Sequence, residues 1–141
     1  MTLYVDTPLL VAALTREAET ARMQAWLAAQ EPGELAISEW VTTEFSSALS
    51  IKLRTRHIEA IHRADALTMF RRLVVENFTI LSISGQQFRT AARFADQSPL
   101  GLRAGDALHL AICADHGAAL CTLDRRLSEA GRALGVKTTL L

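Results

Sequence analysis

The chain has 141 residues, of which 50% are apolar and 21% are charged. This composition excludes a largely disordered chain, and the length fits a single domain spanning residues 1–141. The 15 basic and 15 acidic side chains give a formal net charge of zero, which argues against broad, nonspecific binding to a polyanion and leaves room only for a local basic patch.

Short apolar runs alternate with longer helical patterns along the whole chain. The sequence predicts, in order, a strand at 3–5, a helix from Thr7-Pro8, a helix over 17–29, a strand at 35–37, a helix from a Ser38 cap to about 54, an amphipathic helix over 57–75, a strand at 79–81, a capped helix over 84–95, a helix over 103–115, a strand at 119–122, a helix over 125–134 and a strand at 138–141. Thr7 before Pro8 is interpreted as a helix N-cap, which leaves Asp6 free at the end of the first strand.

Strands separated by helices indicate parallel crossover connections and a sheet that is covered on both faces. We therefore predict an α/β fold, a three-layer α/β/α sandwich with a central, mostly parallel sheet. In such sheets, ligands bind beyond the carboxyl ends of the strands, at the point where the strand order reverses.

Four acidic residues fall near that predicted edge. Asp6 and Asp124 follow strands, Asp106 lies in the first turn of a helix, and Glu44 lies in the second turn after the Ser38 cap. Asp124 could simply cap a helix, and Asp106 could interact with a helix dipole. Taken together, however, carboxylates brought close together repel one another, and a hard divalent cation such as Mg²⁺ or Mn²⁺ compensates that charge.

Basic residues near these acids have two interpretations. Arg103 could contact phosphate or tether an acidic neighbour, and His109, in an apolar helix, is interpreted as a packed or hydrogen-bonded core residue rather than a base. The same choice between phosphate contact and a solvated helix face applies to five arginines that lie close in sequence, Arg54, Arg56, Arg63, Arg71 and Arg72.

The cysteines and the absence of a long apolar run bear on location. Cys113 and Cys121 lie in predicted apolar elements and are expected to be buried free thiols, not a disulfide or a metal pair. No apolar run approaches the roughly 20 residues of a membrane span, and the N-terminus lacks the regions of a secretory signal. We therefore expect a cytoplasmic protein without membrane association.

Four short motifs, in this order and spacing, resemble the PIN-domain family, most closely the VapC-type toxins of toxin–antitoxin pairs. They are Tyr4-Val-Asp-Thr, Thr43-Glu-Phe-Ser-Ser-Ala-Leu, Leu102-Arg-Ala-Gly-Asp-Ala-Leu-His-Leu-Ala and Thr122-Leu-Asp-Arg-Arg-Leu. The resemblance implies a Mg²⁺- or Mn²⁺-dependent endoribonuclease with a parallel sheet, usually a homodimer, held inactive by a cognate antitoxin. Its acidic quartet matches Asp6, Glu44, Asp106 and Asp124, and Thr122 matches a hydroxyl residue beside the last acid.

One position departs from the family pattern. The family often has a small hydroxyl residue two places after the first acid, where this chain has Pro8. Any contribution of that hydroxyl must therefore come from Thr7 or be absent.

The resulting hypothesis is hydrolysis of RNA phosphodiester bonds by metal-activated water. We expect Asp6 and Asp106 to bind metal directly, Asp124 directly or through water, and Glu44 to orient a coordinated water or help to bind the ion. The alternative is a catalytically silent PIN-like module that acts by dimerisation or partner binding, and metal-dependent cleavage of RNA by the purified protein would distinguish the two. Apolar faces around Trp40, Phe45 and the helix at 57–75 are candidates for a homodimer or antitoxin interface, although core burial accounts for any one of them.

Overall fold

Five short strands form one sheet in which every neighbouring pair is parallel. The computed structural model describes residues 1–141, and its strand order is β3-β2-β1-β4-β5. The strands are β1 (Leu3–Val5), β2 (Leu35–Ser38), β3 (Thr79–Leu81), β4 (Ala119–Thr122) and β5 (Thr138–Leu140). The first strand of the chain thus lies at the centre of the sheet.

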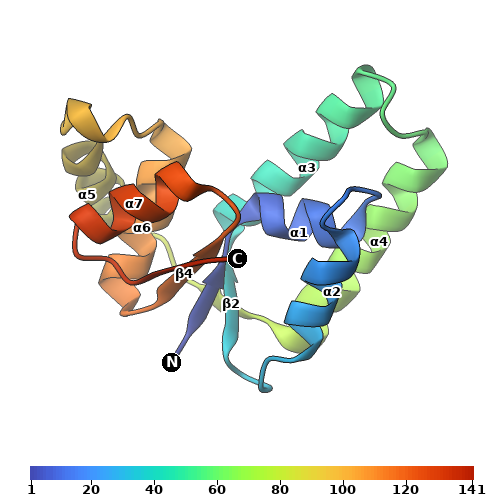
Figure 1. Ribbon diagram of the computed structural model, residues 1–141, viewed down its shortest axis with the longest axis horizontal. Coiled ribbons are helices and arrows are strands. Elements are labelled where there is room, and N and C mark those ends of the chain that lie inside the picture. The colour runs from blue at the N-terminus through green and yellow to red at the C-terminus, as the bar shows by residue number, and fades with distance from the viewer.

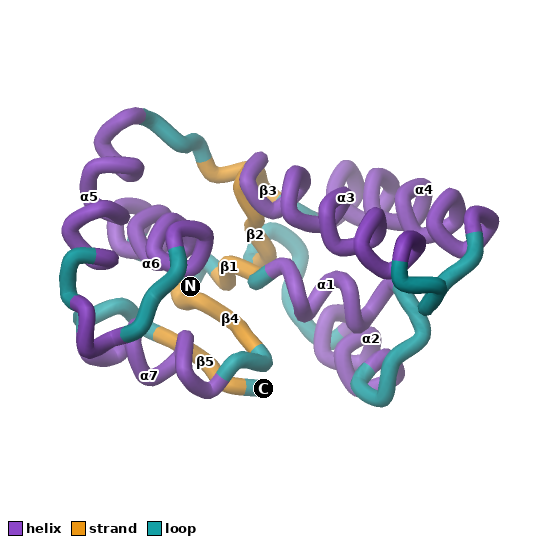
Figure 2. Tube along the Cα trace, turned by 90° about the horizontal axis from the view of Figure 1, so that it is seen from above, coloured by secondary structure: helices purple, strands orange, loops and turns teal.

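Helices cover both faces of this sheet, as Figures 1 and 2 show. One face carries α1 (Thr7–Leu14), α2 (Thr20–Ala28), α3 (Glu39–Arg54) and α4 (Ala60–Asn77), and the other carries α5 (Gly85–Ala95), α6 (Ala104–His116) and α7 (Arg125–Ala133). The predicted α/β fold, with three layers and a parallel sheet, is confirmed. A short 3₁₀ turn at Ser98–Leu100, which the sequence analysis treated as loop, joins α5 to α6.

Burial explains the strand sequences. Strands β2 and β4 are buried at every residue, whereas the edge strands β3 and β5 are exposed or half-buried, as expected for a parallel sheet with helices on both faces. The hydrophobic core contains 27 buried residues drawn from both helical layers. Cys113 and Cys121 are buried and free, as predicted. No helix combines the length and apolar character needed to cross a membrane.

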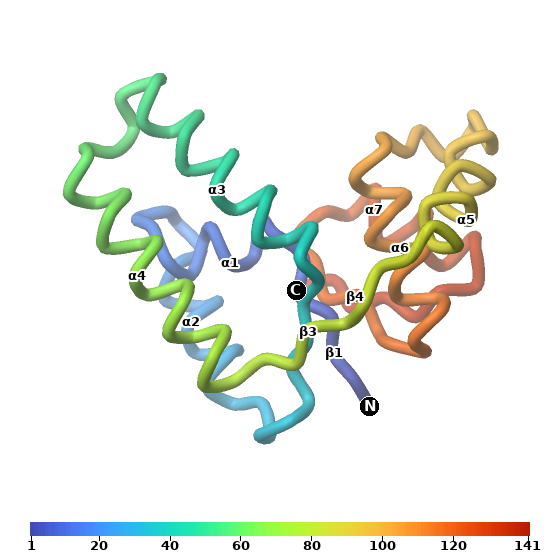
Figure 3. Tube along the Cα trace, turned by 180° about the vertical axis from the view of Figure 1, so that it is seen from behind, coloured from blue at the N-terminus to red at the C-terminus, as the bar shows by residue number.

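Helices α3 and α4 form an antiparallel pair that extends beyond the sheet (Figure 3). The amphipathic helix predicted at 57–75 is observed at Ala60–Asn77. Phe45 is fully buried and stacks on Phe70, with ring centroids 4.3 Å apart, so Phe45 belongs to the core and not to an interface. Ile61 lies within the predicted amphipathic helix, but its side chain is 61% exposed and does not belong to the buried face.

The basic cluster lies on this helical pair. Arg54, Arg56, Arg71 and Arg72 are exposed, Arg63 is half-buried, and none of them forms an ion pair with an acidic side chain. Arg54 donates a hydrogen bond to Ser50 on the same helix. The cluster is therefore compatible with either interpretation of these arginines, and phosphate contact stays a prediction.

The starts of α1 and α2, like that of α4, differ from the sequence prediction. Helix α2 begins at Thr20 because the Thr20 hydroxyl donates to carbonyl groups of Ala12 and Thr15, which closes the turn that precedes it. Helix α1 begins at Thr7, and its N-cap is Asp6, not Thr7. Asp6 adopts an extended backbone conformation and its side chain accepts a hydrogen bond from the Thr7 amide. The first acid therefore also caps a helix.

Candidate active site

The site begins where β1 and β4 end, at the position where the strand order reverses. The Asp6 amide donates to the Cys121 carbonyl at 3.0 Å, which extends the pairing of the two strands by one residue. The Thr122 hydroxyl then donates to Asp6 Oδ2 at 2.8 Å, and Thr122 also accepts a bond from the Asp124 amide at 3.0 Å. Thr122 therefore connects the first and last acids of the motif.

Asp6 is 4% exposed, and its carboxylate is held at both oxygens. Oδ1 accepts from the Thr7 amide at 2.9 Å, and Oδ2 accepts from Thr122. Burial raises the pKa of Asp6 above its ordinary value. His109, Thr122 and the Thr7 amide act in the opposite direction, and the charge of Glu44 adds to the rise.

Glu44 reaches this centre from α3 through one of its two oxygens. Oε1 accepts from the Thr7 hydroxyl at 2.8 Å and from His109 Nε2. Burial disfavours the charged form of Glu44, but the contacts from His109 and Thr7 outweigh burial and lower its pKa. The sequence analysis placed Glu44 near the same edge of the sheet as Asp6, and the structure brings it there. Thr7 donates to Asp6 through its amide and to Glu44 through its hydroxyl.

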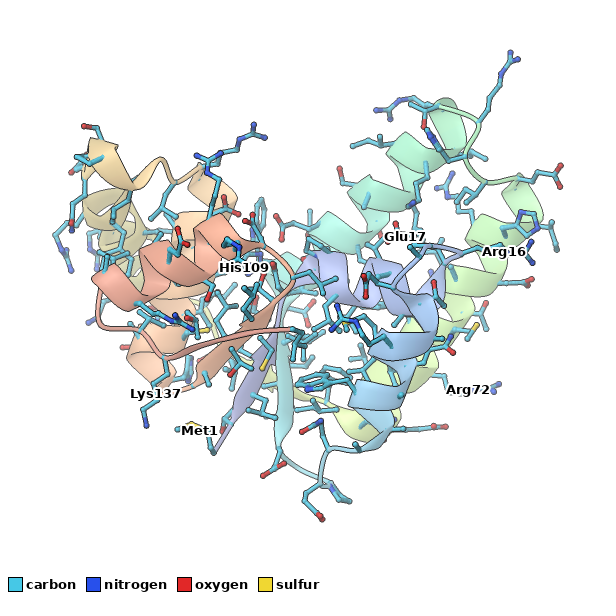
Figure 4. All side chains as sticks on the ribbon, viewed as in Figure 1. Met1, Arg16, Glu17, Arg72, His109 and Lys137 are labelled. Atoms are coloured by element: carbon cyan, nitrogen blue, oxygen red, sulfur yellow. The ribbon has the colours of Figure 1, made fainter.

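His109 lies on α6 and occupies the centre of the cluster, and Figure 4 labels it toward the middle of the molecule. His109 is 1% exposed, and its Nε2 atom lies 3.9 Å from Asp6 Oδ1. Its other nitrogen, Nδ1, lies 2.8 Å from the Tyr4 hydroxyl, which is 2.7 Å from the Ser38 hydroxyl. The prediction of a buried, hydrogen-bonded histidine is confirmed, but the sequence analysis missed its direct contact with Glu44.

Tyr4 and Ser38 were read from sequence as a core strand residue and a helix cap. Both are fully buried, and Ser38 makes no capping bond with its side chain. Burial raises the pKa of Tyr4 far above its usual value, so the phenol remains protonated. The local sequence carries no signal for this hydroxyl pair, because the residues that meet are far apart in the chain.

Asp106 and Asp124 line a separate hollow of about 440 Å³ with Arg103, Arg126 and the 101–102 loop. Burial raises the pKa of Asp106. His109 and the Arg103 backbone lower it in part, whereas Asp124 and Glu44 add to the rise. Asp124 is the N-cap of α7 and accepts bonds from the amides of Arg126 and Leu127 at 2.9 and 3.3 Å. Neither Arg103 nor Arg126 forms an ion pair, so the Arg103 side chain does not tether an acidic neighbour.

A second hollow, of about 520 Å³, runs between α1 and α3 and ends at Glu44. Apolar atoms dominate its wall, including those of Pro8, Trp40 and Ile51. The buried indole N–H of Trp40 has no hydrogen-bond partner. A Cβ atom at Gly105 would lie 3.0 Å from Glu44 Oε2 and 3.4 Å from this indole nitrogen, so the glycine keeps space open beside Glu44.

The four acids thus form two adjoining groups around His109. The charge of Glu44 raises the pKa values of both Asp6 and Asp106, and the charge of Asp124 raises the pKa of Asp106. No three His, Cys, Asp or Glu side chains are gathered closely enough to hold a metal ion by themselves.

Fold and site together define a parallel α/β domain with an acidic centre at its topological switch point. The family model described as PIN domain matches residues 3–133, and the chain belongs to the PIN-domain family. No curated protein sequence matches the chain.

Solved structures of toxin–antitoxin proteins share this fold. VapBC2 from Rickettsia felis, bound to a DNA fragment from its promoter, is 15% identical with a TM-score of 0.70, and the match covers 100% of this chain and 99% of that one. The sarcin–ricin loop cleaving toxin VapC20 from Mycobacterium tuberculosis is 18% identical with a TM-score of 0.72 over 92% of this chain and 95% of that one. FitAcB from Neisseria gonorrhoeae is 15% identical with a TM-score of 0.68, and the match covers 97% of this chain and 96% of that one.

Proposed function

We propose that this PIN-domain protein is a metal-dependent endoribonuclease that acts as the toxin of a toxin–antitoxin pair. The observation that carries the proposal is the meeting of Asp6, Glu44 and Asp106 around one buried histidine at the switch point of the sheet. Several carboxylates in a partly buried site are costly for a fold unless they bind a cation, and Asp6, Glu44, Asp106 and Asp124 are the residues that the sequence resemblance assigns to the acidic quartet of the family.

Mg²⁺ or Mn²⁺ is the proposed cofactor, with Asp6 and Asp106 as direct ligands and Asp124 bound directly or through water. The donor set fits these ions because it consists of carboxylate oxygens, and because burial already raises the pKa values of Asp6 and Asp106. Mg²⁺ usually keeps several waters and needs few protein ligands, which agrees with acids that are near one another without forming a closed set. When bound, the ion supplies Lewis acidity toward water and the phosphate.

The protein's own residues orient the reactants in this scheme. Glu44 uses Oε2, the oxygen without a hydrogen-bond partner, to orient the attacking water, while Oε1 is held by Thr7 and His109. Thr122 fixes Asp6, so that the acid at the end of β1 has one orientation. Arg103 and Arg126 contact the RNA phosphates, since both line the hollow beside Asp106 and Asp124 and neither is paired with an acid.

The decisive experiment compares cleavage and binding of RNA by Asp6→Asn. The amide keeps the size and the N-cap acceptor of Asp6 but removes its charge, so cleavage should fall by roughly 100-fold or more while RNA binding persists. Asp96→Asn, an exposed carboxylate outside the site, is the matched control and should cleave normally. Full cleavage by folded Asp6→Asn would refute the assignment.

A catalytically silent PIN-like module is the second candidate. It is favoured by the engagement of Glu44 with His109, which occupies one oxygen of a proposed site residue. Wild-type protein that fails to cleave RNA in the presence of Mg²⁺ and Mn²⁺, while still binding a partner, would support this candidate over the enzyme.

The proposed protein partner is an antitoxin whose C-terminal segment lies in the groove between α1 and α3. That groove has an apolar wall and ends at Glu44, so a segment lying in it can present arginine or lysine to the acids and compete with metal and RNA phosphate. Co-expression with the product of a small neighbouring gene should give a stable complex without nuclease activity. We further propose a homodimer, and light scattering that gives a monomer would contradict it.

A further inference from the structure

A buried chain of hydrogen bonds leads from the interior of the sheet to Glu44. It runs from the Ser38 hydroxyl to the Tyr4 hydroxyl at 2.7 Å, from Tyr4 to His109 Nδ1 at 2.8 Å, and from His109 Nε2 to Glu44 Oε1. Ser38, Tyr4 and His109 are each no more than 1% exposed, so water cannot replace any of these partners. The elements joined are β1, β2, α3 and α6.

The contacts at the two ring nitrogens of His109 fix the orientation of the imidazole. An ionised carboxylate only accepts hydrogen bonds, so His109 Nε2 donates to Glu44. At the other nitrogen, a neutral imidazole accepts from the Tyr4 hydroxyl at Nδ1, and an imidazolium donates to the Tyr4 oxygen from Nδ1. In either form the bond to Tyr4 holds the ring of His109 in one orientation, and Ser38 bonds only to Tyr4.

At the other end of this hydrogen-bond network, a single oxygen of Glu44 is held in place. Oε1 accepts from both His109 and the Thr7 hydroxyl, whereas Oε2 has no hydrogen-bond partner. The absence of a side chain at Gly105 leaves Oε2 its space, because a Cβ there would lie 3.0 Å away. One oxygen is thus held from two elements, and the other is directed by the geometry of the carboxylate.

We propose that Tyr4 and His109 are positioning residues that fix Glu44 for the reaction. This inference rests on the proposed nuclease function, in which Glu44 orients water. Neither residue reacts: Tyr4 holds the ring of His109 in one orientation, and His109 holds Glu44 Oε1, so that Oε2 has one position before substrate arrives. Such preorganised partners of a reacting group commonly contribute about 10- to 100-fold to activity.

Tyr4→Phe and Ser38→Ala form a matched pair for the test. Each removes one hydroxyl from the same buried network, and Ser38→Ala loses no helix-capping bond, so the losses of stability should be similar. Only Tyr4→Phe removes the hydrogen-bond partner of His109 Nδ1. We expect Tyr4→Phe to lower kcat about tenfold with KM for RNA unchanged, and Ser38→Ala to keep kcat within about twofold of wild type. His109→Gln, whose amide can still donate to Glu44, should recover part of the activity lost in His109→Leu.

Crystal structures of the two metal-free variants give a readout that does not depend on activity. The Glu44 carboxylate should keep its wild-type position in Ser38→Ala and shift or occupy several conformers in Tyr4→Phe. If Glu44 is unchanged in both, or if Tyr4→Phe keeps full kcat, the inference is overturned. If wild-type protein cleaves no RNA but Tyr4→Phe alone displaces Glu44, the proposed function fails and the positioning role stands.

Discussion

Thr122→Val tests whether one buried hydroxyl organises the acidic centre. Thr122 is fully buried, donates to Asp6 Oδ2 at 2.8 Å and accepts from the Asp124 amide at 3.0 Å. Valine has nearly the same shape as threonine but leaves Asp6 Oδ2 and the Asp124 amide without this hydrogen-bond partner. A lost bond to a charged group contributes about 1.5–3 kcal/mol and a lost neutral bond about 0.5–1.5 kcal/mol, so the free energy of unfolding should fall by roughly 2–4 kcal/mol.

The matched control is Thr122→Ser, which keeps the hydroxyl and loses one methyl group at a cost of about 1 kcal/mol. For a chain of this size each kcal/mol corresponds to roughly 4 °C, so Thr122→Val should melt about 8–16 °C below wild type and well below Thr122→Ser. The assay is thermal and urea unfolding followed by circular dichroism with chelator present. If valine is tolerated as well as serine, Thr122 does not hold Asp6.

Three other measurements address the metal, the acids and the RNA. Millimolar Mn²⁺ should raise the melting temperature, and Asp106→Asn should reduce that rise; a wild-type temperature indifferent to Mn²⁺ would count against a metal site. Because burial raises the pKa values of Asp6 and Asp106, the folded state binds their protons more tightly, so this contribution is present below about pH 4 and is lost as the pH rises through the folded-state pKa values; melting in chelator across pH 4–7 should show it. In RNA binding by Asp6→Asn, adding Arg126→Gln should lower the slope of log K against log salt by about one, and Arg132→Gln on the same helix should leave it unchanged.

The fold was largely predictable because its signals are local. Each strand is a short apolar run, each helix has a periodic pattern or a cap, and alternation of the two requires parallel crossovers. The positions of Asp6, Glu44 and Asp106 followed, since strand ends and helix starts in such a sheet meet at one edge. Helix boundaries shifted by a few residues where a side chain such as Thr20 bonded to a distant carbonyl.

The interior of the site was not predictable from the sequence. Tyr4 and His109 are 105 residues apart, and His109 and Glu44 are 65 apart, so no local pattern links them. The apolar neighbours of Tyr4 and His109 in the sequence correctly predicted that both are buried, but they could not reveal which polar atoms would meet. The cap at Asp6 was missed for a related reason: Thr7 is itself a good cap, and its hydroxyl is taken by Glu44 instead.

The central position of β1 sets the time at which the site can exist during synthesis. The bond between Asp6 and Thr122 joins residues 116 positions apart, and β4 must be made before β1 gains its second neighbour. At about 5–20 residues per second, the ribosome needs roughly 6–23 s to add the 116 residues from Asp6 to Thr122, and the first and last acids stay apart for that time. A truncated product that lacks β4 contains Asp6 and Glu44 but neither Thr122 nor Asp124. The nascent protein is therefore unable to assemble its acidic centre until Thr122 and Asp124 have been synthesised.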